Sequence, residues 1–320
     1  MIYVSHPNDI PEDLKPCILT IGKFDGVHLG HQSIIAKTLE LASKQGVKTV
    51  AATFDPPPVQ ILRPDLPIRP PITSIDRKVE LLKYFGISEV VVFQTGHWLL
   101  DLSAKAFFDE IVVSGFDARG LVEGPNFTFG KNRTAGTDEL RNWTEQKNLD
   151  FMEVSPVEFE GHWITSSRIV TSILQGEIAQ ANSMLGHHHI TTGTVVRGAG
   201  RGRSINVPTA NLEQYDTLIP GPGVYAANAR VLSESGQNET DFLPAAVNIG
   251  TQPTFGSDTK TLEVHLVGHP DQDLYGRTVE IIWLEKIRAT VKFDSVEHLM
   301  SQIREDIQKA VTLSHLWVKN

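Results

Sequence analysis

Hydrophobic positions in the first half of the chain form two kinds of run. Short, continuous apolar runs predict buried strands; they are Cys17–Ile21, Thr49–Phe54, Glu89–Phe93, Gly120–Glu123 and Phe151–Val157. Longer runs with apolar residues at helical spacing predict helices; they are His31–Lys44, Asp76–Tyr84 and Ala104–Val113, the last with Ser103 as its N-cap. Strands that alternate with helices predict a parallel sheet with helices on both faces, whose ligands bind beyond the carboxyl ends of the strands.

The pattern changes after about residue 186. The apolar runs are now short, β-branched and separated by Gly, Pro or Asp turns; they are Thr192–Val196, Gly223–Leu232, Pro244–Asn248, Thr261–Val267 and Val279–Leu284. Such runs predict an antiparallel barrel or sandwich. Near the C-terminus, Asp294 and Glu297 form a capping-box pattern ahead of apolar residues at helical spacing, which predicts a closing amphipathic helix. We therefore expect two domains, 1–185 and 186–320, joined at Gly186–His189.

Composition agrees with two globular domains, because the chain has 320 residues, of which 40% are hydrophobic and 21% charged. Cys17 is the only cysteine, the first residues are acidic rather than signal-like, and no apolar run reaches about 18 residues. We therefore expect a soluble cytoplasmic protein without disulfides and without a membrane partner. Both proposed domains are acidic, with net charges of −6 and −3, which argues against a nucleic-acid partner. The oligomeric state is left open.

Three adjacent histidines, His187, His188 and His189, stand at the expected domain boundary. Three successive side chains point in different directions on either a strand or a helix, so they cannot converge on one ion. This favours a linker or barrel entry over a metal site.

A first candidate phosphate site lies where the first predicted strand passes into a helix. His28 and His31 are three residues apart at the helix start, so both imidazoles can lie on one face beside free amides and the positive end of the helix dipole. Gly22, Gly26 and Gly30 let the backbone turn sharply and approach a ligand closely. This pattern predicts an anion site that needs no metal cage. A surface helix start is the plainer alternative.

A second candidate lies in a glycine-rich run that leads to Pro208 rather than into a helix, so it is not a dinucleotide fingerprint. Backbone amides exposed by alternating glycines can wrap phosphates, and nearby cations add to the attraction. The run offers Gly198, Gly200, Gly202, Arg201 and Arg203. Taken alone, it is equally well explained as a hairpin turn.

Both runs carry a family resemblance. The string Gly22-Lys-Phe-Asp-Gly-Val-His-Leu-Gly-His31 contains the H-x-G-H signature of nucleotidyltransferases and resembles the adenylyltransferase domain of prokaryotic bifunctional riboflavin kinase/FAD synthetases. Similar motifs follow in the family's order: Thr53-Phe-Asp-Pro56, Gly124-Pro-Asn-Phe-Thr-Phe-Gly130, Ile164-Thr-Ser-Ser-Arg-Ile169, Pro208-Thr-Ala-Asn211, Pro220-Gly-Pro-Gly-Val-Tyr225, Asn248-Ile-Gly250, Leu262-Glu-Val-His265 and Leu274-Tyr-Gly276. The resemblance implies an α/β plus β fold: a Rossmann-like nucleotidyltransferase domain with a parallel sheet, then an antiparallel six-stranded riboflavin kinase-like barrel with a closing helix.

The resemblance also implies two transferase reactions. The second domain would phosphorylate riboflavin to FMN with Mg2+ and ATP, and the first would adenylylate FMN to FAD with release of pyrophosphate. In the first domain it implies catalytic roles for His28 and His31. Nucleotide or phosphate contacts are expected from Gly22, Phe24, Gly30, Asn126, Ser166, Ser167 and Arg168.

In the second domain the resemblance implies that Glu263 is the base that accepts the proton of the ribityl hydroxyl, and that it contacts the flavin. A carboxylate suffices because phosphoryl transfer depends mainly on positioning and charge neutralisation. Thr209 and Asn211 are the implied ligands of magnesium, which prefers hard oxygen donors. Further nucleotide contacts are expected from Gly200, Arg201, Gly202, Arg203 and Asn248, and a further flavin contact from Arg288.

Two positions in the first domain depart from the family pattern. Pro57 stands where the family's Phe-Asp-Pro-His-Pro has histidine, and Val170 stands at the terminal arginine of Ser-Ser-Thr-x-x-Arg. Each lost charge-assisted contact to phosphate is worth about 1.5–3 kcal/mol, so both losses would weaken adenylylation. The alternative is therefore a monofunctional riboflavin kinase whose first domain is a degenerate nucleotide- or flavin-binding or regulatory module.

Overall fold

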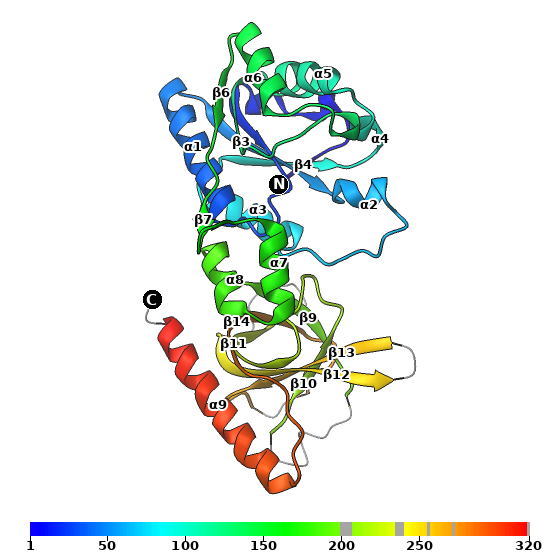
Figure 1. Cartoon of the computed structure of the whole chain (residues 1–320), viewed down its shortest axis with the longest axis vertical. Coiled ribbons are helices and arrows are strands. Elements are labelled where there is room, and N and C mark those ends of the chain that lie inside the picture. Colours follow the sequence, from blue (N-terminus) through cyan, green and yellow to red (C-terminus); the bar gives the residue numbers. More distant parts are fainter. Residues whose placement is uncertain (199–206, 234–239, 255–256, 271–272, 319–320) are drawn as a thin grey trace. The chain divides into compact units, whose positions relative to one another are not determined.

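The computed structural model describes residues 1–198, 207–233, 240–254, 257–270 and 273–318. The chain divides into two compact units, residues 1–69 with 74–165 and residues 70–73 with 166–320. The first contains a parallel sheet and the second a closed antiparallel barrel, so the expected fold class is confirmed (Figure 1). Among the described residues, no helix is both long and apolar enough to cross a bilayer.

The sheet of the first unit has the order β1-β4-β3-β2-β5-β6, and all neighbouring strands are parallel. Its strands are β1 (Ile2–Val4), β2 (Cys17–Ile21), β3 (Lys48–Asp55), β4 (Glu89–Gln94), β5 (Ala118–Glu123) and β6 (Asp150–Glu153). From β2 the chain moves outward through β3 and β4, then returns to place β5 on the other side of β2. Such a reversal opens a crevice at the carboxyl ends of β2 and β5, where ligands of α/β sheets bind.

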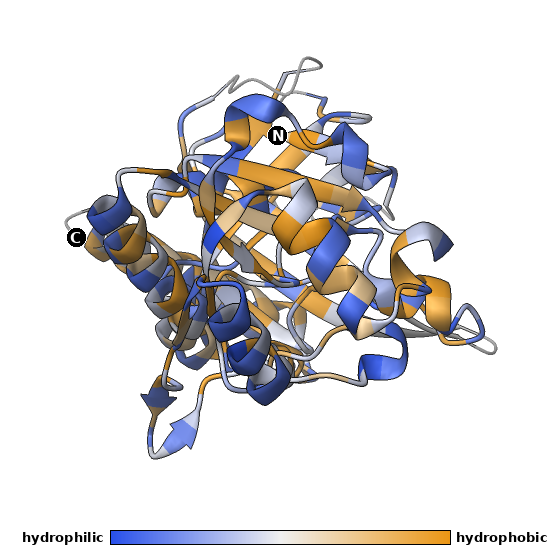
Figure 2. Cartoon of the chain, turned by 90° about the horizontal axis from the view of Figure 1, so that it is seen from above, coloured by the Kyte–Doolittle hydropathy of each residue, from blue (hydrophilic) through white to orange (hydrophobic). Residues whose placement is uncertain are grey.

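Helices cover both faces of this sheet. They are α1 (Leu29–Gln45), α2 (Pro58–Leu62), α3 (Ile75–Tyr84), α4 (His97–Leu100), α5 (Ala104–Ala106) with its π-helical continuation η3 (Phe107–Gly115), and α6 (Thr137–Gln146). Alternate residues of one strand serve opposite cores: Val91 and Phe93 of β4 pack in one apolar cluster, and Val90 and Val92 in another. Figure 2 shows the strands as mostly hydrophobic and the outward helix faces as mostly polar.

The second unit begins with two helices, α7 (Ser166–Gln175) and α8 (Ile178–Leu185), that dock on the barrel. The Gly221 amide donates to the Ile173 carbonyl at 3.0 Å, and the Asn182 side chain donates to the Trp283 carbonyl at 2.9 Å. These bonds explain why both helices belong to the same compact unit as the barrel.

The barrel closes in the order β10-β13-β12-β11-β14-β9. Its strands are β9 (Ile190–Val196), β10 (Ala210–Glu213), β11 (Gly223–Leu232), β12 (Leu243–Thr254), β13 (Ser257–Leu266) and β14 (Thr278–Arg288). Leu262, Val264 and Leu266 of β13 are buried, whereas the residues between them are half-buried and face outward. Part of the outer surface is covered by the closing helix α9 (Val296–Val318), where Ser314 donates to Asn228 of β11 at 2.5 Å (Figure 1).

Some local predictions were wrong for identifiable reasons. The Asp294–Glu297 capping box does not form, because Ser295 caps α9 by accepting a hydrogen bond from the His298 amide at 3.2 Å. The last strand of the sheet ends at Glu153 instead of Val157, ahead of Pro156. The unpredicted elements are short ones: β1, β10, the β7–β8 hairpin (Glu158–Phe159 and His162–Trp163), α2, α4 and α8, together with the more polar α6.

Candidate active sites

The loop between β2 and α1 has an unusual backbone that shapes the first candidate site. Phe24, Gly26 and Val27 have φ values of 46°, 87° and 38°, which only glycine adopts without cost. The apolar core holds the two strained residues in place, because Phe24 and Val27 are 1% and 0% exposed. The Gln32 side chain also donates to the Val27 carbonyl at 2.9 Å. The loop is thus held in shape before any ligand arrives.

The two histidines lie together at the start of α1, as predicted. Their rings stack with centroids 3.7 Å apart, and Phe24 packs edge-on against His31 at 5.3 Å. His28 is the N-cap, and its Nδ1 accepts from the His31 amide at 3.4 Å, which leaves Nε2 to carry the proton of a neutral ring. Glycine at position 30 leaves room for the His28 ring, because a Cβ there would make a tight contact of 3.1 Å with it.

His31 is kept neutral by its surroundings. Burial, and then electrostatic interactions with His28 and Lys78, lower its pKa well below the ordinary value of 6.5. Its Nδ1 is buried and has no hydrogen-bond partner among the described residues. A buried polar atom without a partner is rare in proteins, so this nitrogen is available to a ligand group.

The second candidate site is a row of side chains around the barrel. Glu263 of β13 lies directly opposite Asn211 of β10 on one side and Asn248 of β12 on the other. The row continues from Asn248 to Val224 of β11 and from Val224 to Arg288 of β14. Directly paired residues project from the same face with Cβ atoms about 4.5–5.5 Å apart, so the carboxylate and two amides meet on the outer face.

The neighbours of this row fix its shape. A Cβ on Gly198 would lie 2.1 Å from the Asn211 side-chain nitrogen, so the backbone at Gly198 lies close against that amide. The Arg288 guanidinium is held by the Asp306 carboxylate of α9, with Nη2 2.8 Å from Oδ2. Arg288 therefore joins β14 to α9 while standing in the row.

The donors near the row fit magnesium. Thr209 precedes β10 directly, and Thr209 and Asn211 offer a hydroxyl and an amide oxygen, to which the Glu263 carboxylate is adjacent. All are hard oxygen donors of the kind that Mg2+ binds together with substrate phosphates. No cluster of three His, Cys, Asp or Glu side chains able to hold a metal occurs among the described residues.

Comparisons with known proteins agree with this division into two sites. Residues 10–168 match the FAD synthetase family and residues 185–314 the riboflavin kinase family. The chain is 31% identical to the bifunctional riboflavin kinase/FMN adenylyltransferase of Bacillus subtilis (strain 168), over 97% of this chain and 96% of that protein. The chain belongs to this bifunctional family. Matches to both halves favour the bifunctional interpretation over the monofunctional alternative.

Two further relatives support the assignment. The bifunctional riboflavin kinase/FMN adenylyltransferase of Listeria monocytogenes (strain EGD-e) is 32% identical, over 96% of each chain. The crystal structure of a protein from Streptococcus pneumoniae, described as a macrolide-efflux protein, is 30% identical with a TM-score of 0.84, covering 97% of this chain and 98% of that one. This chain therefore shares its fold with a solved structure over almost the whole length of both chains.

The remaining predicted residues of the adenylyltransferase half have different surroundings. Asn126 is exposed in the turn after β5, and a Cβ on Gly22 would meet the Phe24 ring at 3.2 Å. Ser166, Ser167 and Arg168 form the first turn of α7 in the second compact unit. Ile164, two residues before α7, lies beside the start of α1, because its carbonyl would be 3.8 Å from a Cβ on Gly30.

The two departures from the family pattern have clear structural positions. Pro57 is the N-cap of α2, with no side-chain bond to the helix. Val170 is 7% exposed and lies on the apolar side of α7 with Ile169 and Ile173. Neither side chain can donate a hydrogen bond. In the kinase half, the predicted contacts Gly200, Arg201, Gly202 and Arg203 lie outside the described residues.

A buried lysine that the sequence analysis missed lies near the histidine pair. Lys78 is 6% exposed and shares a face of α3 with Ile75 and Leu82, which pack in the cluster that contains Phe24 and Val27. Burial lowers its pKa, while the carboxylates of Asp25 and Asp55 oppose that shift. Its position on the apolar face of a helix, four residues after the N-cap Ser74, is the signal that could have found it.

A buried glutamate, also missed, stands at the crevice. Glu123 ends β5, is 3% exposed, and its carboxyl oxygen accepts from the Ile21 amide at 2.7 Å. Pairing of β2 with β5 ends at Leu19 and Leu121, so this side chain bridges the two strands just where they separate. Burial raises its pKa well above 4.5, while the hydrogen bond from the Ile21 amide opposes that shift.

The three boundary histidines have separate partners. His188 Nδ1 lies 3.2 Å from the Trp283 carbonyl, and His189 Nε2 donates to the Leu218 carbonyl at 2.6 Å. His187 Nδ1 lies 3.1 Å from the His188 carbonyl. Burial lowers the pKa of His189 to about 4, so it is neutral at physiological pH. Their hydrogen bonds fasten α8 and the entry of β9 to the barrel.

Proposed function

We propose that this chain makes both FMN and FAD: the half built on residues 186–320 phosphorylates riboflavin with ATP, and the half built on residues 1–185 adenylylates FMN. The observation that carries the proposal is the barrel register, which sets Glu263 between Asn211 and Asn248. No single strand could bring a base and two polar side chains together in this way, and all three belong to motifs that the family shares.

In the kinase reaction Glu263 accepts the proton of the riboflavin 5'-hydroxyl as that oxygen attacks the γ-phosphorus of ATP, and the bond from the γ-phosphorus to the bridging oxygen breaks to release ADP. Thr209 and Asn211 would hold Mg2+, which, when bound, neutralises charge on the phosphates. Asn248 flanks the carboxylate on the other strand and orients it or a nucleotide oxygen. Arg288, fixed by Asp306, orients the flavin. Gly200, Arg201, Gly202 and Arg203 complete the nucleotide contacts.

In the adenylyl reaction the FMN phosphate attacks the α-phosphorus of ATP, and the bond to pyrophosphate breaks. The FMN phosphate is anionic at neutral pH, so the site needs positioning and stabilisation of charge rather than a strong base. His28 donates from Nε2, and His31, the loop amides and the start of α1 complete the cradle. Gly22, Phe24 and Gly30 shape this cradle, while Asn126, Ser166, Ser167 and Arg168 add contacts.

Lys78 supplies the positive charge that Pro57 and Val170 lack. The Asp25 and Asp55 carboxylates favour its protonated form when no nucleotide is bound. A bound triphosphate would offer a denser negative charge for the Lys78 ammonium than these carboxylates do. This contribution supports adenylylation despite the two lost donors.

The ligands follow from these reactions: riboflavin, FMN, FAD and ATP, with Mg2+ as the metal. The acidic charge of both halves supports a protein that binds neither nucleic acid nor membranes, and the single buried Cys17 supports a cytoplasmic location.

The proposal is tested by incubating the protein with ATP and Mg2+ and either riboflavin or FMN, and separating the flavins by chromatography. We expect FMN and then FAD from riboflavin, and FAD from supplied FMN. FMN without FAD, even from supplied FMN at high enzyme concentration, would support the monofunctional alternative. No FMN from riboflavin would exclude the kinase.

A further inference from the structure

A histidine outside the predicted site holds the segment that carries the two magnesium ligands. His265 lies two residues after Glu263 on β13, on the same outward face. Its Nδ1 lies 2.8 Å from the Pro208 carbonyl oxygen. A carbonyl can only accept, so Nδ1 carries the proton and donates it.

This bond begins where the backbone pairing ends. The ladder between β10 and β13 runs from Leu212 with Leu262 to Ala210 with Val264 and reaches no further. Pro208 has no amide hydrogen, so it cannot donate to a neighbouring strand. Its carbonyl is instead bound by the His265 side chain, which extends the pairing by two residues.

Thr209 is therefore held from both sides. Ala210, which follows it, is the first residue of the ladder, and Pro208, which precedes it, is bound by His265. Magnesium demands near-octahedral geometry with short bonds of about 2.0–2.1 Å, so its ligands must be placed closely before the metal arrives. A threonine on an unanchored strand end would not meet that requirement.

We propose that His265 is a positioning residue of the kinase site, which orders the Pro208–Asn211 segment for the magnesium nucleotide through its bond to the Pro208 carbonyl. This inference rests on the proposed kinase function. It assigns His265 no contact with substrate and no proton transfer. The same strand thus supplies the base, Glu263, and the anchor of the metal ligands.

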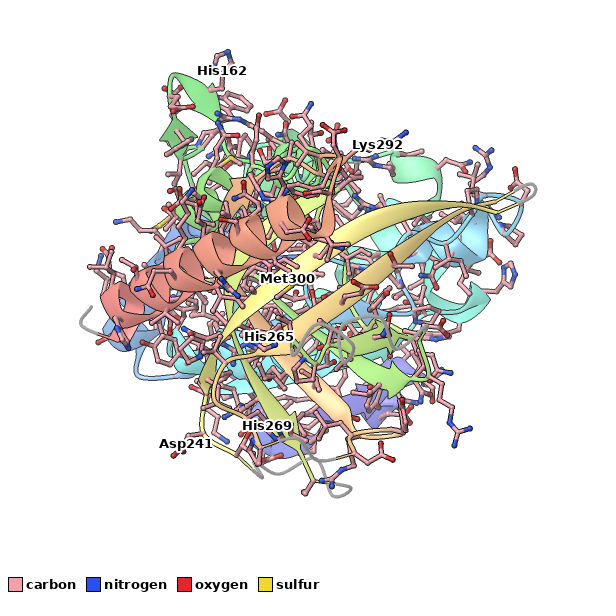
Figure 3. The ribbon with its side chains drawn as sticks, turned by 90° about the horizontal axis from the view of Figure 1, so that it is seen from below. His162, Asp241, His265, His269, Lys292 and Met300 are labelled. Carbon is pink, nitrogen blue, oxygen red and sulfur yellow. The ribbon has the colours of Figure 1, made fainter. Side chains whose placement is uncertain are left out.

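Substitutions at position 265 distinguish the role of the hydrogen bond from that of the imidazole ring. In His265→Asn the amide nitrogen replaces Nδ1 and can reach the carbonyl, whereas in His265→Gln the longer side chain places its nitrogen near Nε2. His265→Ala removes the donor. His269 is a matched control, because its Nδ1 lies 2.6 Å from the carbonyl of its own neighbour Pro270; Figure 3 labels it apart from His265.

Two measurements do not depend on turnover. Hydrogen exchange of the metal-free protein, followed over residues 209–213, should be about tenfold faster in His265→Ala than in wild type. The dissociation constant for Mn2+ in the presence of ADP, read from the EPR signal of free Mn2+, should rise about tenfold or more, as for other partners that orient metal ligands. His265→Asn should stay within about threefold of wild type, His265→Gln should resemble His265→Ala, and His269→Ala should change neither value.

The kinase assay then adds the functional consequence. The Mg2+ concentration that gives half-maximal FMN formation should rise about tenfold in His265→Ala, while FAD formation from supplied FMN stays unchanged and reports an intact fold. Exchange and Mn2+ binding like wild type in His265→Ala would overturn the inference, as would loss in His265→Asn equal to that in His265→Ala. A wild-type protein that forms no FMN would contradict the proposed function instead, and the exchange and Mn2+ measurements would still decide the role of His265.

Discussion

The two proposed phosphate sites of this protein are built in opposite ways. In the barrel, Asn211, Glu263 and Asn248 project from neighbouring strands and are placed by sheet register. In the parallel-sheet unit, the histidine pair sits on a loop with left-handed backbone at Phe24 and Val27, packed against a buried apolar cluster. The first arrangement is rigid because hydrogen-bonded strands define it; the second depends on burial of its supports. The barrel site should therefore lose activity when a single chemical group is removed. The loop site should lose activity in that case and also when its buried neighbours are changed.

The largest effect should come from Glu263, the proposed base of the barrel site. Glu263→Gln keeps the shape of the side chain but cannot accept a proton, so riboflavin phosphorylation should fall by about 100-fold to 10,000-fold. FAD formation from supplied FMN should be unchanged. Glu213→Gln is the matched control, because Glu213 is exposed on β10 beyond Asn211. Initial rates with saturating Mg2+ and ATP measure the effect. An equal loss in both reactions would mean that the sites are not separate.

The loop site should respond next. His28→Asn retains an N-cap acceptor for α1 but removes the Nε2 donor, so FAD formation should fall about 10-fold to 100-fold with little loss of stability. Riboflavin phosphorylation should not change. His97→Asn is the control, since the His97 side chain is 80% exposed. Rates with supplied FMN test this, and an unchanged FAD yield would show that the adenylyl site lies elsewhere.

A smaller effect is expected from the buried lysine. Lys78→Met keeps the length and the apolar packing but removes the charge, so the KM for ATP in FAD formation should rise about tenfold, or about 1.4 kcal/mol. Lys78→Arg should recover most of the affinity, which a purely structural role would not explain. Lys37→Met is the control, because Lys37 is half exposed and paired with Glu40 on α1. Equal loss in the Met and Arg variants would reject a role for the charge.

The smallest effect concerns stability at the crevice. The pKa of Glu123 is raised in the folded state, so unfolding releases a proton above about pH 4.5 and the stability that Glu123 contributes falls as pH rises. The slope for one group is at most about 1.4 kcal/mol per pH unit. Glu123→Gln keeps an oxygen for the Ile21 amide without ionising. Its stability relative to wild type should therefore increase as the pH rises above about 4.5 in urea unfolding, and a constant difference would contradict the raised pKa.

The difference between the two proposed sites also explains which strands and site residues could be predicted from the sequence. The bounds of β2 and β11 agree with prediction because uninterrupted apolar or β-branched residues specify those strands locally. Glu263 and Asn211 were found through their motifs, although neither motif says that β10 and β13 pair. β10 itself was missed, because its four residues carry too little periodicity to predict a strand.

Residues that matter through burial could not be found in this way. Lys78 is one of several charged residues of α3, and Glu123 ends a short apolar run; whether such a residue faces solvent or the core depends on tertiary packing. His265 stands in a recognised motif, but its bond to Pro208 joins residues far apart in sequence. In each case a long-range contact sets the role of the residue.

The central claim is that one chain carries two separate sites, and mixing two variants tests it most directly. Glu263→Gln and His28→Asn are each incubated with riboflavin, ATP and Mg2+, first alone and then together, and FAD is quantified by chromatography. Alone, Glu263→Gln should make little FMN or FAD, and His28→Asn should accumulate FMN and form FAD only slowly. Together they should form FAD, because FMN released by one variant is adenylylated by the other. If Glu263→Gln still converts supplied FMN but the mixture forms no more FAD than the two variants do separately, transfer of FMN between independent sites would be contradicted. If Glu263→Gln fails to convert supplied FMN, the assignment of the two reactions to separate sites would be contradicted.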